Sequence, residues 1–187
     1  MTRLRTSNSS ISQVTLLTGL PGVGKSTIIK RLIQLMPDKF SGFYTEELRK
    51  EGERNGFKVT TPDGQEAILA TKDTDVDFDN CIIFGNYKVN ISALHQVVIP
   101  ALLKAMSSTK IVVVDEIGPM EILSDEFCRV MTRIIDNPTL TVIGSIVLRP
   151  YYFADSVKKH PRVNMRIVTK DNRNEIFDSL RISVESY

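Results

Sequence analysis

In this 187-residue chain, residues 19–26 form the most specific pattern of residues that could bind a ligand. They read GLPGVGKS and match the pattern G-x-x-x-x-G-K-[ST] at every fixed position. An apolar run over 13–18 precedes them, and Ile28, Ile29 and Leu32 follow at helical spacing. In this context the pattern predicts a phosphate-binding loop (P-loop), because glycines let several backbone N–H groups face one anion and the helix N-terminus adds positive potential.

The residue types of the P-loop suggest separate roles. Lys25 can reach the β- and γ-phosphates of a nucleotide, and the Ser26 hydroxyl can bind Mg²⁺. Thr27 is expected near the α-phosphate. The alternative, a structural glycine-rich turn, is less favoured because a second motif agrees with the first. The residues predicted to bind the nucleotide are consecutive: Gly19, Leu20, Pro21, Gly22, Val23, Gly24, Lys25, Ser26 and Thr27.

The second motif is a pair of acids at the end of a predicted buried strand, since residues 111–116 read IVVVDE. Ligands bind beyond the carboxyl ends of parallel strands. Asp115 is therefore expected to hold Mg²⁺ together with Ser26. Glu116 is placed to orient or deprotonate a water molecule aimed at the γ-phosphate. The predicted catalytic residues are Lys25, Asp115 and Glu116.

Asp115 and Glu116 have two other possible interpretations. They could cap the next helix, although Ser124 or Asp125 directly precedes that helix and suits the role better. Residues 115–118 also match the D-x-x-G pattern of switch GTPases. A guanine-reading N/T-K-x-D should then follow, but the nearest candidate, TKDN at 169–172, lacks the final acid. The sequence thus predicts no guanine selectivity.

Further polar residues have an open role. Ser145, near the end of the next strand, could contact the attacking water or serve only in packing. An arginine could neutralise charge in the transition state, and position favours Arg54 and Arg149. His95 and His160 are expected to be packing or surface residues. The arginines considered are Arg49, Arg54, Arg149, Arg162, Arg166 and Arg173, each of which alone is more readily a solvated side chain.

Strands and helices alternate along most of the chain, which predicts an α/β fold with a mostly parallel sheet flanked by helices. Turn-like segments and short strands between about 40 and 70 predict an antiparallel β insertion. Strands are expected over 13–18, 40–46, 56–61, 65–70, 86–91, 111–114, 140–147 and 163–169. Helices are expected over 28–36, 92–106 (with Pro100 as a kink or late start), 123–134, 151–159 and after 171, and a loop over 71–82.

Composition limits the class of protein. Lys plus Arg total 24 and Asp plus Glu total 22, and this net charge of +2 argues against a dedicated nucleic-acid binder. No apolar run is long enough for a membrane span or a signal peptide. Cys81 and Cys128 form no CxxC pair, which favours the reduced cytoplasm. We expect a flexible arm over 1–12 and a single P-loop domain over 13–187.

Four segments together resemble a family of small P-loop nucleoside triphosphatases that includes the thermophile NTPases and the cancer-related nucleoside triphosphatase. They read TGLPGVGKST, GFYTEELRKEGERNGFKV, VVVDEIGPMEI and VTKDNRNEIF. The resemblance covers about residues 13–180 and implies a RecA-like fold. It also implies Mg²⁺-dependent hydrolysis of ATP, GTP and other nucleotides to the diphosphate and phosphate. Two positions depart from the family pattern: Pro119 replaces a common Lys, and Asn90 replaces an acid.

The sequence therefore predicts a Mg²⁺-dependent nucleoside triphosphatase with broad base specificity. Nucleoside triphosphates are its expected ligands, and neither a membrane nor a nucleic acid is expected as a partner. One alternative is a P-loop kinase acting on a nucleotide or small molecule, whose arginine-rich lid only the 49–54 turn resembles. Another is a non-enzymatic switch that recruits a partner when nucleotide is bound.

Overall fold

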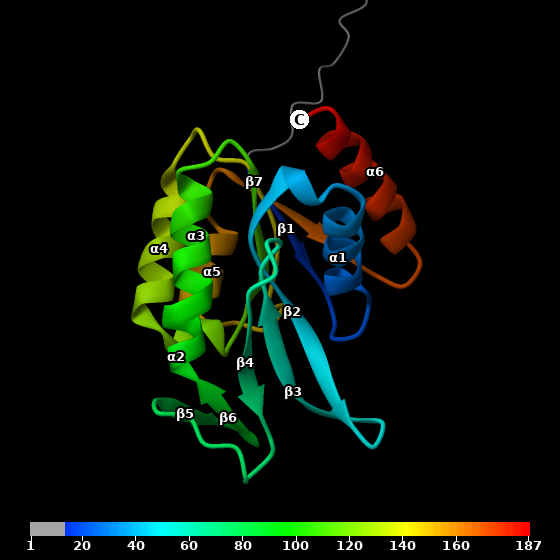
Figure 1. The fold of residues 1–187 in the computed structure, drawn as a ribbon. Coiled ribbons are helices and arrows are strands. Elements are labelled where there is room, and N and C mark those ends of the chain that lie inside the picture. The colour runs from blue at the N-terminus through cyan, green and yellow to red at the C-terminus, as the bar shows by residue number, and fades with distance from the viewer. Residues whose placement is uncertain (1–13) are drawn as a thin grey trace, which may run out of the picture.

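The computed structural model describes residues 14–187 (Figure 1), so the predicted arm over 1–12 lies outside the described residues. The described residues form one nine-stranded sheet in the order β5-β6-β4-β3-β2-β7-β8-β1-β9. The strands are β1 (Val14–Thr18), β2 (Phe40–Lys50), β3 (Glu53–Thr60), β4 (Glu66–Thr71), β5 (Cys81–Phe84), β6 (Tyr87–Asn90), β7 (Ile111–Ile117), β8 (Val142–Ile146) and β9 (Val163–Ile167).

The sheet has a parallel and an antiparallel part, and β2 belongs to both. The first residues of β2 pair in parallel with β7, while its later residues pair antiparallel with β3. On the parallel side β8 lies between β7 and β1, and β9 forms the edge. On the other side β3, β4, β6 and β5 are antiparallel. The predicted α/β fold, with a mostly parallel core and an antiparallel addition, is confirmed.

Helices cover both faces of the parallel part (Figure 1). Successive strand side chains point to opposite faces, so Val112 and Val114 pack in one core while Ile111 and Val113 pack in the other. The helices α1 (Lys25–Leu35) and α6 (Arg173–Glu185) cover the Ile111 face. The opposite face is covered by the helical segment α2 (Ile91–Ala93), the π-helical turn Leu94–Val98, α3 (Ile99–Met106), α4 (Asp125–Asp136) and α5 (Tyr152–Lys158), while short 3-10 turns lie at Pro37–Lys39 and Glu121–Leu123.

Pro100 shapes the helical segment that was predicted over 92–106. The π-helical turn Leu94–Val98 comes directly before α3, and Pro100 lies in the first turn of α3. Proline has no N–H and is tolerated there, where that donor would have no intrahelical partner. The late start predicted at Pro100 therefore describes α3, although the preceding residues are also helical.

The turn-like segment predicted between the strands over 40–46 and 56–61 is wrong in extent. The strands β2 and β3 continue through this charged segment, and only Glu51 and Gly52 form the turn, with φ of 53° and 83°. Positive φ at both central residues is the geometry of a two-residue hairpin turn. The predicted loop over 71–82 also ends early, because β5 begins at Cys81.

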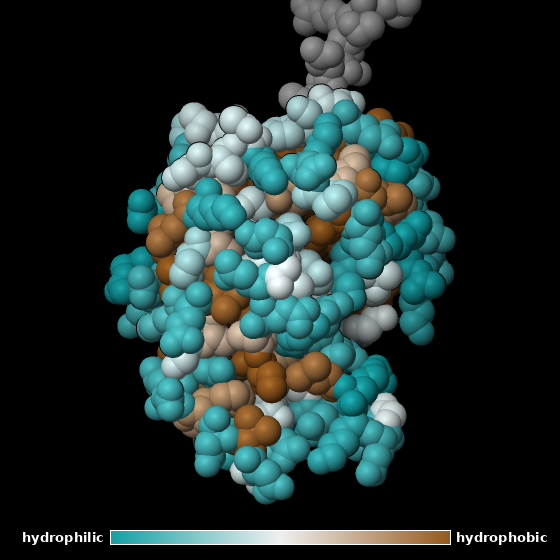
Figure 2. Space-filling model, viewed as in Figure 1, coloured by the Kyte–Doolittle hydropathy of each residue, from teal (hydrophilic) through white to brown (hydrophobic). Residues whose placement is uncertain are grey.

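The surface follows the charge pattern of the sequence. Hydrophilic side chains cover most of the face shown in Figure 2, with smaller apolar areas between them.

Cys81 and Cys128 are free thiols. None of the helices within residues 14–187 has the length and apolar character needed to cross a bilayer.

Gly42 is required where β2 meets β7. Its φ is +126°, and a Cβ there would lie 2.2 Å from the Val113 carbonyl oxygen. We expect Gly42→Ala to lower the free energy of unfolding by about 3 kcal/mol, because strain and a backbone clash combine. Gly85→Ala is the control: Gly85 also has a positive φ, but nothing lies within 4 Å of the added carbon. It should cost about 1 kcal/mol in the same urea titration, and equal losses would contradict the clash.

Candidate active site

The P-loop joins β1 to α1 through a backbone that only glycine adopts easily. Gly19, Gly22 and Gly24 all have positive φ. A Cβ on Gly19 would lie 2.4 Å from the carbonyl oxygen of Val168, so the loop also needs glycine for its close approach to the chain after β9. The loop leads directly into α1, and the first N–H groups of a helix have no intrahelical partner and attract anions.

Lys25 lies over the P-loop. Its Nζ donates to the carbonyl oxygen of Gly19 at 3.1 Å and to that of Leu20 at 3.3 Å. Val23 differs from its neighbours because its side chain is buried in the core on the α1 face. It anchors the loop and leaves only its backbone for a ligand.

Asp115 is completely buried at the end of β7. The pairing of β7 with β8 is irregular between Val114 and Ile117, which sets Asp115 out of the regular register. Its Oδ1 accepts hydrogen bonds from the Ser26 hydroxyl at 3.2 Å and from the Ser145 hydroxyl. Its Oδ2 is buried and has no hydrogen-bond partner among the described residues. A buried carboxylate oxygen without a partner costs free energy, and a cation bound beside it would offset that cost.

Burial raises the pKa of Asp115, and the hydrogen bonds from Ser145 and Ser26 oppose that rise. Ser145 is itself fully buried in β8. Its hydroxyl donates to the Asp115 carboxylate, a contact that neither of the two roles predicted for Ser145 includes.

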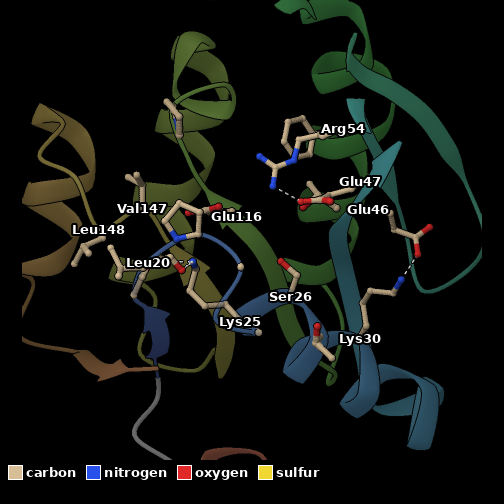
Figure 3. Close-up of a pocket in the computed structure, with 18 of the residues that line it drawn as sticks. Leu20, Lys25, Ser26, Lys30, Glu46, Glu47, Arg54, Glu116, Val147 and Leu148 are labelled. Carbon is tan, nitrogen blue, oxygen red and sulfur yellow. Dashed lines mark hydrogen bonds and ion pairs between the residues drawn. The ribbon is translucent and has the colours of Figure 1, made fainter. Parts of the chain in front are cut away.

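A cleft of about 820 Å³ lies between the P-loop and the hairpin formed by β2 and β3 (Figure 3). Every residue of 19–27 except Val23 lines it. Glu116 lines it as well, and burial together with the charge of Asp115 raises the pKa of Glu116. Such a carboxyl group binds a proton more readily at neutral pH than an exposed glutamate, which suits a general base.

Three of the six candidate arginines reach this cleft: Arg49, Arg54 and Arg149. Arg162 instead donates to the carbonyl oxygen of Leu140 at 2.9 Å, and Arg166 donates to the Ser179 hydroxyl at 3.1 Å. Arg54 and Arg149, the two arginines that their sequence positions favour for neutralising transition-state charge, both line the cleft.

Other candidates have structural surroundings. Arg173 packs beside Gly24, its Cδ 3.4 Å from where a Cβ would lie. The His95 Nε2 is 3.2 Å from the Ser124 hydroxyl, which caps α4 by accepting from the Phe127 N–H. The His160 Nε2 is 3.1 Å from an Asp136 carboxylate oxygen.

The two departures from the family pattern have different surroundings. Pro119 lines the cleft. Asn90 lies at the start of α2, where its Oδ1 accepts from the Ala93 N–H and its Nδ2 donates to the Ile68 carbonyl oxygen at 3.1 Å. A carboxylate could make the first of these bonds but not the second, so Asn90 fits a structural role.

Glu121 was missed by the sequence reasoning, although its motif was singled out. It is buried beside the site, and its Oε2 would lie 2.8 Å from a Cβ on Gly118. Burial, and then the charge of Glu116, raise its pKa to about 8. The signal in the sequence was an acid placed between Met120 and the apolar residues Ile122 and Leu123.

Glu121 should make the stability of the nucleotide-free protein depend on pH. Its pKa is higher in the folded chain than the ordinary 4.5, so folding takes up a proton and the free energy of unfolding falls as pH rises from about 5 to 8. Glu121→Gln should remove up to about 1.4 kcal/mol per pH unit from this slope in urea titrations. Glu175→Gln, on the exposed surface of α6, is the control, and an unchanged Glu121→Gln slope would contradict the assignment.

The sequence is similar to those of known nucleoside triphosphatases. The sequence model of the NTPase family matches residues 14–181. The chain is 37% identical to nucleoside-triphosphatase THEP1 of Thermotoga maritima over 165 residues, which cover 88% of this chain and 91% of that protein. It is 31% identical to the human cancer-related nucleoside-triphosphatase over 182 residues, covering 91% and 95%.

Solved structures show the same fold. The crystal structure of THEP1 from the hyperthermophile Aquifex aeolicus superposes with a TM-score of 0.81 at 28% identity, covering 92% of this chain and 99% of that one. The solution structure of the human cancer-related nucleoside triphosphatase gives a TM-score of 0.76 at 30% identity, covering 93% and 98%. With its P-loop, buried acid and cleft in the same chain, the protein belongs to the NTPase family and is a nucleoside triphosphatase.

Proposed function

We propose that this nucleoside triphosphatase hydrolyses ATP, GTP and other nucleoside triphosphates to the diphosphate and phosphate, and that it needs Mg²⁺. The observation that carries this proposal is the Asp115 carboxylate, which is buried beside Ser26 with one oxygen unpartnered among the described residues. A hard cation with oxygen ligands suits that pair, since Mg²⁺ commonly takes one or two protein oxygens and completes its shell with water and phosphate.

The chain's own groups divide the work of binding. The N–H groups at the start of α1 and in the P-loop would hold the phosphate oxygens. The Lys25 Nζ, which donates to the carbonyl oxygens of Gly19 and Leu20, would exchange them for the β- and γ-phosphates. Ser26 and Asp115 would hold Mg²⁺. When bound there, the ion would neutralise charge on the phosphates.

Glu116 would act on the attacking water. It lines the cleft beside Asp115, and its raised pKa suits a group that accepts a proton near neutral pH. Asp115 is completely buried beside Ser26. Its role is to hold the metal, with Ser145 fixing its orientation from β8.

Broad base specificity is supported by the loop after β9. Thr169 and Asn172 lie where a guanine-reading motif would lie. The Thr169 N–H donates to the Asn172 Oδ1 at 2.8 Å, and the Asn172 N–H donates to the Thr169 Oγ1 at 3.3 Å. Both side chains are thus occupied in shaping the loop, which leaves neither dedicated to one base.

The setting of the activity is part of the proposal. We infer a cytoplasmic enzyme, because two free thiols suit a reducing compartment. Residues 13–187 would work as one P-loop domain, with the β-rich insertion at about 40–70 forming one wall of the cleft.

Phosphate release tests the reaction class directly. With Mg²⁺ and no added acceptor, ATP, GTP, CTP and UTP should be hydrolysed at rates within about tenfold of one another, and chelation of the metal should lower each rate by about 100-fold or more. A malachite-green assay measures this. Hydrolysis of one nucleotide alone would contradict broad specificity, and release only with an acceptor present would favour a kinase.

Replacing the proposed base should separate binding from turnover. Glu116→Gln keeps the size of the side chain but cannot take the proton, so kcat should fall by about 10²–10⁴-fold. The Kd for a non-hydrolysable ATP analogue should stay within about threefold, as measured by calorimetry. Glu175→Gln on α6 should leave both quantities unchanged. Near-normal hydrolysis by Glu116→Gln would remove Glu116 from the mechanism.

A further inference from the structure

One carboxylate on the cleft wall holds two arginines at once. The Glu47 Oε2 accepts from the Arg49 Nη2 at 2.7 Å, and the Glu47 Oε1 accepts from the Arg54 Nη2. Arg49 also donates to the Gly52 carbonyl oxygen at 3.0 Å, which ties it to the hairpin turn. All three charged side chains line the same cleft as the P-loop. Glu47 thus stands as an anion among cationic groups that face a phosphate site.

Arg54 is the arginine of the β3 strand that lines the cleft. Figure 3 shows its side chain beside Glu47, across the cleft from Leu20 and Lys25 of the P-loop. Its guanidinium carbon lies 5.4 Å from the centre of the Phe57 ring, so an aromatic neighbour limits its freedom. About 41% of its side chain is exposed, which leaves it room to move.

The hairpin that carries Arg54 is tied to the helix that starts at the P-loop. Glu46 forms ion pairs with Lys30 of α1 and with Lys58 of β3, the latter at 3.2 Å. Lys58 pairs also with Glu66 of β4 at 2.8 Å. This chain of charges spans α1, β2, β3 and β4, so the two walls of the cleft keep a defined separation.

We propose that Glu47 holds the place of a phosphate, and that Arg54 transfers from Glu47 to the γ-phosphate when a triphosphate enters. The proposal rests on the proposed hydrolysis. A γ-phosphate offers more negative charge than a carboxylate and accepts the same bidentate donors, so it competes for Arg54. Arg49 stays with Glu47 and keeps that carboxylate paired. Arg54 then stabilises the charge that builds on the transferring phosphoryl group, and it is a catalytic residue by this contact.

The first test compares turnover with capture of a transition-state analogue. Arg54→Ala should lower kcat about 100-fold or more with KM for ATP within about threefold. It should also abolish binding of ADP with aluminium fluoride and Mg²⁺, while binding of ADP alone stays within threefold. Arg54→Lys should recover part of both losses. Arg181→Ala is the matched control, because Arg181 also pairs with a glutamate, Glu185, but on α6.

The second test addresses the competition. Glu47→Gln keeps the shape of the side chain and weakens its hold on Arg54, so affinity for a non-hydrolysable ATP analogue should rise about threefold or more while affinity for ADP is unchanged. Calorimetry measures both. An unchanged or lower affinity for the analogue overturns the placeholder role of Glu47.

The outcomes separate this inference from the proposed function. If the wild type releases phosphate and Arg54→Ala has a normal kcat and normal aluminium fluoride binding, the inference is overturned. The proposed hydrolysis is unaffected by that result. If Arg54→Ala is normal and Arg149→Ala instead loses kcat and aluminium fluoride binding, Arg149 has the role proposed for Arg54, and the inference is again overturned. The wild type could instead release no phosphate without an acceptor, while its capture of ADP with aluminium fluoride still depends on Arg54. That pair of results contradicts the proposed hydrolysis and supports the role of Arg54 in phosphoryl transfer.

Discussion

Burying a carboxylate away from water costs free energy unless donors surround it, and Asp115 is buried completely. The chain supplies two hydroxyls for one oxygen, from Ser26 at the start of α1 and from Ser145 in β8, and none for the other. Three segments far apart in the sequence therefore converge on one atom. Asp115 therefore depends on the packing of β7, β8 and α1 for its hydrogen bonds, and one of its oxygens remains without a donor beside the cleft.

The two walls of the cleft have different structural origins. The P-loop wall is built from the parallel sheet, where a conventional strand–loop–helix unit fixes its geometry. The opposite wall is the β2–β3 hairpin, whose position follows from β2 serving both parts of the sheet. The Lys30–Glu46 ion pair then fixes the hairpin to α1. The helix that begins at the P-loop is therefore joined by an ion pair to the opposite wall of the cleft.

Much of this arrangement was readable from the sequence. The P-loop has a fixed spacing because backbone N–H groups must converge on an anion, and the β-branched run over 111–114 at the start of β7 indicates a strand buried on both faces. Local patterns of this kind predicted the parallel core and the positions of Lys25, Ser26, Asp115 and Glu116. The family and the fold that the resemblance implied are confirmed.

The rest depends on contacts that no local pattern records. The strand β5 exposes Cys81 and its neighbours and so lacks alternating burial, while the charged hairpin reads as a turn. The support of Asp115 by Ser145 and the burial of Glu121 arise only when distant segments pack together. Arg54 and Glu47 are near in sequence, but only the fold shows that they face the P-loop.

The most direct test of the central claim is the effect of Mg²⁺ on the binding of a non-hydrolysable ATP analogue, measured by calorimetry in the wild type and in Asp115→Asn. If Asp115 and Ser26 hold the ion against the phosphates, Mg²⁺ should tighten binding by about tenfold or more in the wild type and have little effect in Asp115→Asn, since the amide offers no charge. An Asp115→Asn protein that keeps the full Mg²⁺ enhancement would contradict the account.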